Sequence, residues 1–121
     1  MKIDAHHHFW KYDPDTYSWM NENMDILKVD YQPADLKRET EKSGIDGVVS
    51  VQADQSLRET DDLLEHAKVN DFIKGVVGWL PLADLNVRDL MDKYAINSFL
   101  KGIRHVVQDE PDDSFILGEQ F

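Results

Sequence analysis

Four short runs rich in β-branched and other apolar residues alternate with helical segments, and this alternation is the strongest constraint on the fold. The runs cover residues 2–6, 45–51, 72–80 and 102–107. Strands separated by helices pair in parallel through right-handed crossovers. The sequence therefore predicts an α/β protein, built either as an open doubly wound sheet or as part of a (β/α)8 barrel. The pattern by itself leaves both arrangements open.

Helices are predicted between these strands over residues 33–43, 57–69 and from Asn86 onward. Pro33 suits the first turn of a helix because its missing N–H is not needed there, and Gly44 suits the end of the same helix. Ser56 stands three residues before Glu59, which is the spacing of a capping box. Ser114 is expected to cap a further helix near the end of the chain.

Length and charge exclude several classes of protein. The 121 residues suit one domain, and the formal net charge of −11 repels phosphate backbones, so nucleic-acid binding is not expected. The chain has no cysteine, which fits a cytoplasmic protein and excludes a thiolate metal site. No apolar run is long enough for a membrane span, so no membrane association is expected.

The end of the first predicted strand carries a pair of histidines, His6 and His8. A strand has a side-chain period of two, so both rings face the same side, while His7 faces the other side and is expected to be structural. Two imidazoles can share one divalent ion, for which Zn²⁺ is the best candidate, although two histidines alone leave zinc under-coordinated. At the carboxyl end of a barrel strand, the pair would point into an active-site mouth.

The residues around this pair resemble the lactonase branch of the amidohydrolase superfamily, which includes L-fuconolactone hydrolases. Residues 3–10 (IDAHHHFW) resemble the opening I-D-[AT]-H-x-H-F-W of that branch. Further segments resemble it in the same order: 17–20 (YSWM), 30–36 (DYQPADL), 44–47 (GIDG), 49–53 (VSVQA), 76–79 (VVGW) and 101–112 (KGIRHVVQDEPD). The resemblance covers nearly the whole chain.

The resemblance implies a TIM-type (β/α)8 barrel of which residues 1–121 form the N-terminal half, with about four βα units. It also implies hydrolysis of a sugar or related lactone, in which His6 and His8 are catalytic and polarise the carbonyl or bind a divalent metal. A metal is not obligatory in this branch. Later strands of such barrels contribute further histidines and an Asp, so we expect this chain alone to be inactive.

Substrate contacts are expected from Gln52, Arg104, His105 and Trp10. Gln52 ends the second predicted strand, and Arg104 and His105 lie in the fourth, where a guanidinium or an imidazole can hold a carbonyl or carboxylate. Neighbours on a strand face opposite ways, so Arg104 and His105 are not both expected to face the site. Trp10, together with Trp19 and Tyr12, either walls a sugar-sized pocket or packs as a lid on the core.

Two alternatives to a lactone hydrolase stay open. The first is a decarboxylase of the related amidohydrolase branch, and the segment GIRH at residues 102–105 favours the lactonase over it. The second is a catalytically inert chain, either a remnant or one half of an assembled barrel. Because four barrel strands leave two open edges, we expect a homo-oligomer or a partner that supplies the other half.

Overall fold

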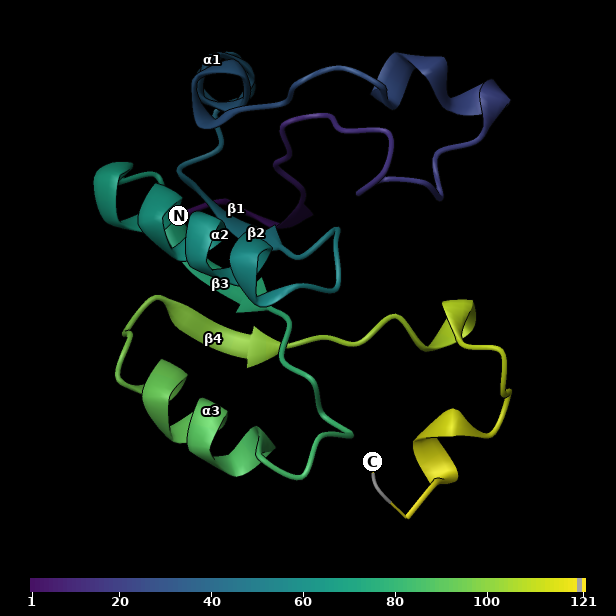
Figure 1. Cartoon of the computed structure of the whole chain (residues 1–121). Coiled ribbons are helices and arrows are strands. Elements are labelled where there is room, and N and C mark those ends of the chain that lie inside the picture. Colours follow the sequence, from purple (N-terminus) through teal and green to yellow (C-terminus); the bar gives the residue numbers. More distant parts are fainter. Residues whose placement is uncertain (120) are drawn as a thin grey trace.

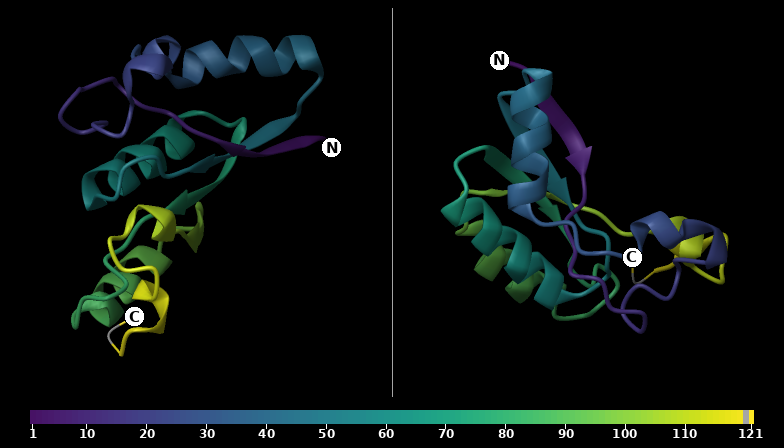
Figure 2. Two further views of the ribbon diagram at one scale, coloured as in Figure 1. Left: turned by 90° about the vertical axis from the view of Figure 1, so that its right-hand side faces the viewer. Right: turned by 90° about the horizontal axis from the view of Figure 1, so that it is seen from above.

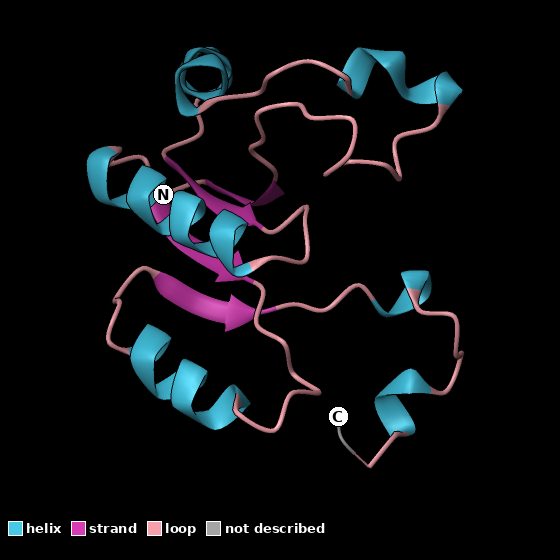
Figure 3. Ribbon diagram, in the orientation of Figure 1, coloured by secondary structure: helices cyan, strands magenta, loops and turns pink. Residues whose placement is uncertain are grey.

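A computed structural model of the chain describes residues 1–119 and 121, and it shows four parallel strands in the order in which they occur along the chain. The strands are β1 (Ile3–His7), β2 (Gly47–Val51), β3 (Ile73–Gly78) and β4 (Leu100–Ile103). Each neighbouring pair is parallel, and the helices lie outside the curve of the sheet (Figures 1 and 3). Consecutive strands joined by crossovers of one hand place all their helices on one face, so this arrangement is a segment of a (β/α)8 barrel.

Three α-helices connect the strands: α1 (Pro33–Ser43), α2 (Leu57–Val69) and α3 (Val87–Ala95). The bounds predicted for the first two helices are confirmed, and Asn86 is the N-cap of the third. Gly44 ends α1 in the left-handed conformation with φ of 67°, which glycine adopts without a steric penalty.

The capping box predicted at the start of α2 is only half formed. The Ser56 side chain accepts a hydrogen bond from the Glu59 N–H at 3.2 Å, as expected. The Glu59 carboxylate does not return to Ser56 but accepts from the N–H groups of Ala53 and Asp54. Backbone amides of the loop before α2 are therefore the partners of this carboxylate, in place of the Ser56 N–H.

The fourth strand is shorter than the predicted run over residues 102–107 and begins earlier. After Ile103 the Arg104 N–H still bonds to the Gly78 carbonyl at 2.9 Å, but the Val106 N–H bonds to the Gln55 side chain at 2.8 Å. The neighbouring strand β3 has ended at Gly78, so no backbone partner is left to continue the ladder. The chain then forms a short 3₁₀ helix, η2 (Val107–Asp109).

One other local prediction needs correction. The helix expected after Ser114 is only a 3₁₀ turn, η3 (Phe115–Leu117), and Ser114 makes no side-chain cap. His66 is half-buried on α2, where its ring contacts Phe9 with 5.8 Å between the centroids. The loop between β1 and α1 contains a further 3₁₀ helix, η1 (Glu22–Leu27).

The main core lies between the sheet and the helices, and the side of the sheet away from the helices is less covered. Val48 and Val76 face the helices and are fully buried. Val49 and Val77, one residue further along each strand, face the other way and are only half-buried. A second cluster packs within the first loop around Trp10, Tyr17 and Met20. No helix in the described part of the chain is long and apolar enough to cross a membrane.

Candidate active site

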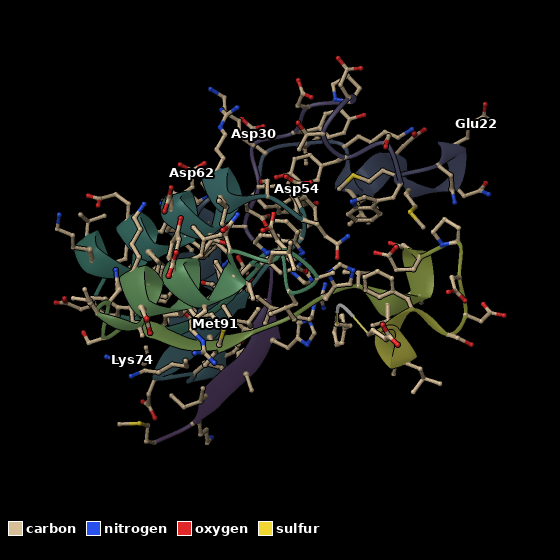
Figure 4. All side chains as sticks on the ribbon, turned by 60° about the horizontal axis from the view of Figure 1, so that its bottom comes forward. Glu22, Asp30, Asp54, Asp62, Lys74 and Met91 are labelled. Atoms are coloured by element: carbon tan, nitrogen blue, oxygen red, sulfur yellow. The ribbon has the colours of Figure 1, made fainter. Side chains whose placement is uncertain are left out.

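The segments that follow the strands gather at the carboxyl end of the sheet and enclose a hollow of about 660 Å³. The first loop and the segment after β4 both extend from this end, as Figure 1 and the right-hand view of Figure 2 show. Asp54 lies at this end, whereas Lys74 lies at the opposite end of the strands (Figure 4). The lining residues are His8, Ser18, Trp19, Met24, Ala53, Asp54, Gln55, Arg104, Val106, Gln108 and Asp109. This is the end of the strands where barrel enzymes carry their active sites.

His8 lies in this hollow with one ring nitrogen committed to the backbone. Its Nδ1 is 2.9 Å from the Val51 carbonyl oxygen, and because a carbonyl can only accept, Nδ1 carries the proton. Nε2 is therefore the nitrogen with a free lone pair. Burial is the main cause that lowers the pKa of His8, with the nearby His6 and Arg104 acting in the same direction.

His6 faces the same side of β1, as the strand period predicts. The two ring centroids lie 5.0 Å apart, which confirms the predicted juxtaposition of His6 and His8. The His6 Nε2 atom is 3.5 Å from Nη1 of Arg104. His7 faces away, where its Nε2 lies 3.1 Å from the buried Ser50 hydroxyl, and burial lowers its pKa to about 4.

Arg104 and Gln52 were each expected to contact substrate, and the structure places them in contact with each other. Arg104 Nε donates to Gln52 Oε1 at 2.9 Å, and Arg104 Nη2 donates to the Gln52 backbone oxygen at 3.0 Å. Gln52 is fully buried, and its Nε2 has no partner among the described residues. Gln52 therefore holds the guanidinium from behind, and Arg104 is the member of the pair that lines the hollow.

His105 points away from the hollow, so the prediction that Arg104 and His105 diverge is confirmed. The Trp79 indole donates to His105 Nδ1 at 3.2 Å, and His105 Nε2 lies 2.5 Å from a Glu110 carboxylate oxygen. An indole N–H can only donate, so Nδ1 is unprotonated and Nε2 donates to Glu110. Direct contact of His105 or Gln52 with substrate stays a prediction, since neither lines the hollow.

Trp10 is part of the loop cluster and not of the hollow. Its indole N–H donates to the carbonyls of Leu27 and Val29, and 8% of the residue is exposed. Trp19 lies against it with 6.4 Å between the ring centroids, and 44% of Trp19 is exposed. The aromatic wall of the hollow is therefore Trp19, and direct contact of Trp10 with substrate stays a prediction.

Sequence reasoning missed two residues that shape the site, Glu59 and Gln55. Glu59 is buried beneath the loop after β2, and burial raises its pKa to about 7. Gln55 joins that loop to the segment after β4 through the Val106 N–H. The available signals were the position of Gln55 shortly after a predicted strand and that of Glu59 in a predicted capping box, but neither shows which backbone groups these residues meet.

The described residues do not complete a metal site. No group of three or more His, Cys, Asp or Glu side chains that could hold an ion occurs among them. His8 fits a ligand role, because metal-bound histidines commonly donate their other N–H to a carbonyl. The Arg104 guanidinium lies beside His6 and places a positive charge where a cation would bind. This chain therefore offers two imidazole ligands, together with one positive charge that disfavours metal binding.

The sequential parallel sheet, with a polar hollow at its carboxyl end, defines part of a (β/α)8 barrel. The chain belongs to the amidohydrolase family, whose family model matches residues 3–115. It is 32% identical over 115 residues to an L-fucono-1,5-lactonase of Burkholderia ambifaria, and 36% identical over 114 residues to one of Burkholderia multivorans. The matches cover 95% and 93% of this chain but 40% and 38% of those proteins.

Solved structures agree with this assignment. An amidohydrolase from Burkholderia multivorans with bound zinc superposes on the whole chain with a TM-score of 0.94 and 33% identity, and the chain covers 43% of it. An amidohydrolase from Bifidobacterium longum subsp. infantis, with a TM-score of 0.62 and 23% identity, shows the fold alone. The chain thus spans less than half the length of the relatives it matches.

Proposed function

We propose that this chain supplies the lactone-carbonyl side of the active site of a hydrolase that acts on a sugar lactone such as L-fucono-1,5-lactone. The observation that carries the proposal is the placement of the Arg104 guanidinium. It is held by Gln52 on two donors, lies beside His6 and lines the hollow. The names of the relatives support the choice of a lactone as substrate.

The chemistry follows from what each group can donate or accept. Arg104 Nη1 donates to the lactone carbonyl oxygen and stabilises the negative charge that develops there as water attacks the carbonyl carbon. His8, neutral near pH 7, accepts a hydrogen bond from the attacking water through Nε2. His8 takes the proton of this water as the carbon–oxygen bond forms. The bond from the carbonyl carbon to the ring oxygen then breaks, the ring oxygen receives that proton, and a hydroxy acid leaves.

A zinc ion at the histidine pair would replace the hydrogen bond from water to His8, because the Nε2 lone pair of His8 cannot serve both. It would be held by His6 and His8 together with ligands from elsewhere, and it would supply further polarisation of the carbonyl. The bound zinc of the Burkholderia multivorans amidohydrolase supports this possibility for the family.

The test is a titration with L-fuconate, the hydroxy acid that the proposed reaction releases. We expect the chain to bind it and Arg104→Met to weaken binding by at least about ten-fold, since a hydrogen bond to a charged group contributes about 1.5–3 kcal/mol. Arg88→Met on α3 is the matched control, because Arg88 is exposed on the outer helix layer. Equal affinities of the two variants, or no binding by the unmodified chain, would contradict the proposal.

A further inference from the structure

Glu59 is a buried carboxylate whose partners are all backbone amides. It lies in the first turn of α2 with 7% of its surface exposed, and no cationic side chain of the described residues forms an ion pair with it. One of its oxygens accepts from the N–H of Ala53 at 2.9 Å and from the N–H of Asp54 at 2.8 Å. A buried carboxylate is unfavourable unless such bonds compensate it, so this position calls for a reason.

The reason lies in the peptide group that joins Gln52 to Ala53. Its N–H donates to the Glu59 carboxylate, and its C=O accepts from Arg104 Nη2 at 3.0 Å. The two groups belong to one planar unit, so an anion acts on the positive end of this dipole and a cation on the negative end. Glu59 and Arg104 are thus coupled through a single peptide group.

The same loop holds the neighbourhood of Arg104 at two further points. The Gln52 side-chain oxygen accepts from Arg104 Nε at 2.9 Å, and the Gln55 side-chain oxygen accepts from the Val106 N–H at 2.8 Å. Movement of the loop would therefore release the guanidinium and the backbone two residues beyond it. With Nε and Nη2 engaged, Nη1 is left to face His6 and the hollow.

We propose that Glu59 is a positioning residue, which orients the Arg104 guanidinium for its ligand by anchoring the peptide between Gln52 and Ala53. Its importance for lactone binding rests on the proposed function. Its hold on Arg104 does not, and it can be measured without any ligand.

The titration of Glu59 can be used to test its coupling to Arg104, because its surroundings shift its pKa. Burial raises the pKa of Glu59 to about 7, the neighbouring Asp54 acts in the same direction, and its amide partners and Arg104 oppose the rise. Tyr17 of the first loop also faces it, and Glu59 contributes, after burial, to the raised pKa of that phenol. Above pH 7 the ionised carboxylate holds both amides firmly, and below that pH protonation weakens these bonds.

The experiment follows the Arg104 Nε–H resonance by ¹⁵N NMR between pH 5 and pH 9, with the resonance assigned by its loss in Arg104→Lys. We expect one titration step near pH 7 that coincides with that of the Glu59 carboxyl carbon and with shifts of the Ala53 and Asp54 amides. The step should be absent in Glu59→Gln. It should persist in Glu65→Gln, which neutralises an exposed carboxylate on the same helix.

Several outcomes would overturn the proposal. A step that persists in Glu59→Gln would report a nearby histidine instead. If Glu59→Gln does not fold, the unmodified chain still decides. Titration midpoints of the Glu59 carboxyl carbon and the Arg104 Nε–H resonance that differ by more than about one pH unit would exclude the coupling.

A second measurement separates this inference from the proposed function. If both hold, Glu59→Gln weakens L-fuconate binding about three- to ten-fold at pH 8, the loss expected for one hydrogen-bonded anchor, and Glu65→Gln does not. If the unmodified chain shows the coupled titration but binds no L-fuconate, the proposed function fails and the positioning role of Glu59 stands.

Discussion

His8 is fixed by Val51, whose carbonyl oxygen on the neighbouring strand accepts from His8 Nδ1 at 2.9 Å. This bond selects one neutral tautomer and leaves Nε2 free at the hollow. We expect long-range ¹H–¹⁵N spectra at pH 7 to show a protonated Nδ1 and an unprotonated Nε2, and the ring to titrate below the ordinary histidine range. A ring that is protonated on both nitrogens at pH 7 would contradict the acceptor role proposed for His8.

His7 should make stability depend on pH in a defined direction. Its pKa is about 4 in the folded chain and about 6.5 in the unfolded chain, so between these values the unfolded state binds more protons. Its contribution is therefore complete above pH 6.5 and is lost as the pH falls toward 4, by up to about 3 kcal/mol. Denaturant unfolding of the unmodified chain and of His7→Gln should show this slope only in the first.

The unmodified chain must be compared with His7→Gln because the contribution of Glu59 to stability changes with pH in the opposite direction. Its pKa is raised, so the folded chain binds the extra proton and this contribution falls as the pH rises through the same interval. Identical slopes for the unmodified chain and His7→Gln would show that His7 is not held neutral by burial.

Gly78 should not accept a side chain. A Cβ at this position would lie 2.7 Å from Thr60 Cγ2, where α2 meets β3, so Gly78→Ala should destabilise the fold by about 1–3 kcal/mol. Gly102→Ala is the control, because its Cβ would meet only Val77 at 3.7 Å. Thr60→Ser removes the clashing methyl and keeps the hydroxyl that bonds to Trp79, which would lie 3.1 Å from the new Cβ, so it should partly rescue Gly78→Ala. Failure of this rescue in denaturant unfolding would place the strain elsewhere.

The purified chain should hydrolyse L-fucono-1,5-lactone no faster than buffer does. Among the described residues, Arg104 and His8 line the hollow and His6 lies beside Arg104, but no group of three that could hold a metal occurs. The chain also spans only about 40% of its curated relatives. Acid release in a pH-stat, with and without added Zn²⁺, measures this. Turnover that His6→Ala abolishes would show instead that these residues suffice.

The chain should self-associate. β1 pairs only with β2 and β4 only with β3 among the described strands, so both edges carry unpaired backbone groups. Val77 on the less covered side of the sheet is half-buried, and a second copy would cover both the edges and this side, although the net charge of −11 opposes association. We expect sedimentation equilibrium at micromolar concentration to show a dimer or a larger species.

A matched pair of variants tests which surface is used. Val77→Asp should favour the monomer, whereas Val69→Asp at the exposed end of α2 should not. If the unmodified chain is a compact monomer that unfolds cooperatively, the strand edges and the less covered side of the sheet need no second copy, and the prediction of self-association is wrong.

Much of the fold was accessible from local sequence patterns. The bounds of α1 and α2 follow from Pro33, Gly44 and Ser56, because these residues act on the backbone within a few positions of themselves. The end of β4 was misjudged, since residues 104–107 have β-prone side chains but no neighbouring strand to pair with. Strand length depends on a partner, which a local pattern does not contain.

For the site, the sequence by itself determined that His6 and His8 share one face, because the period of a strand is a property of the backbone alone. Only the tertiary structure decided that Arg104 meets Gln52, 52 positions earlier, and that Glu59 holds the peptide between Gln52 and Ala53. Those contacts depend on the register and curvature of three strands and on the path of the loop after β2. Such quantities arise from packing the whole sheet against its helices, and no short stretch of sequence specifies them.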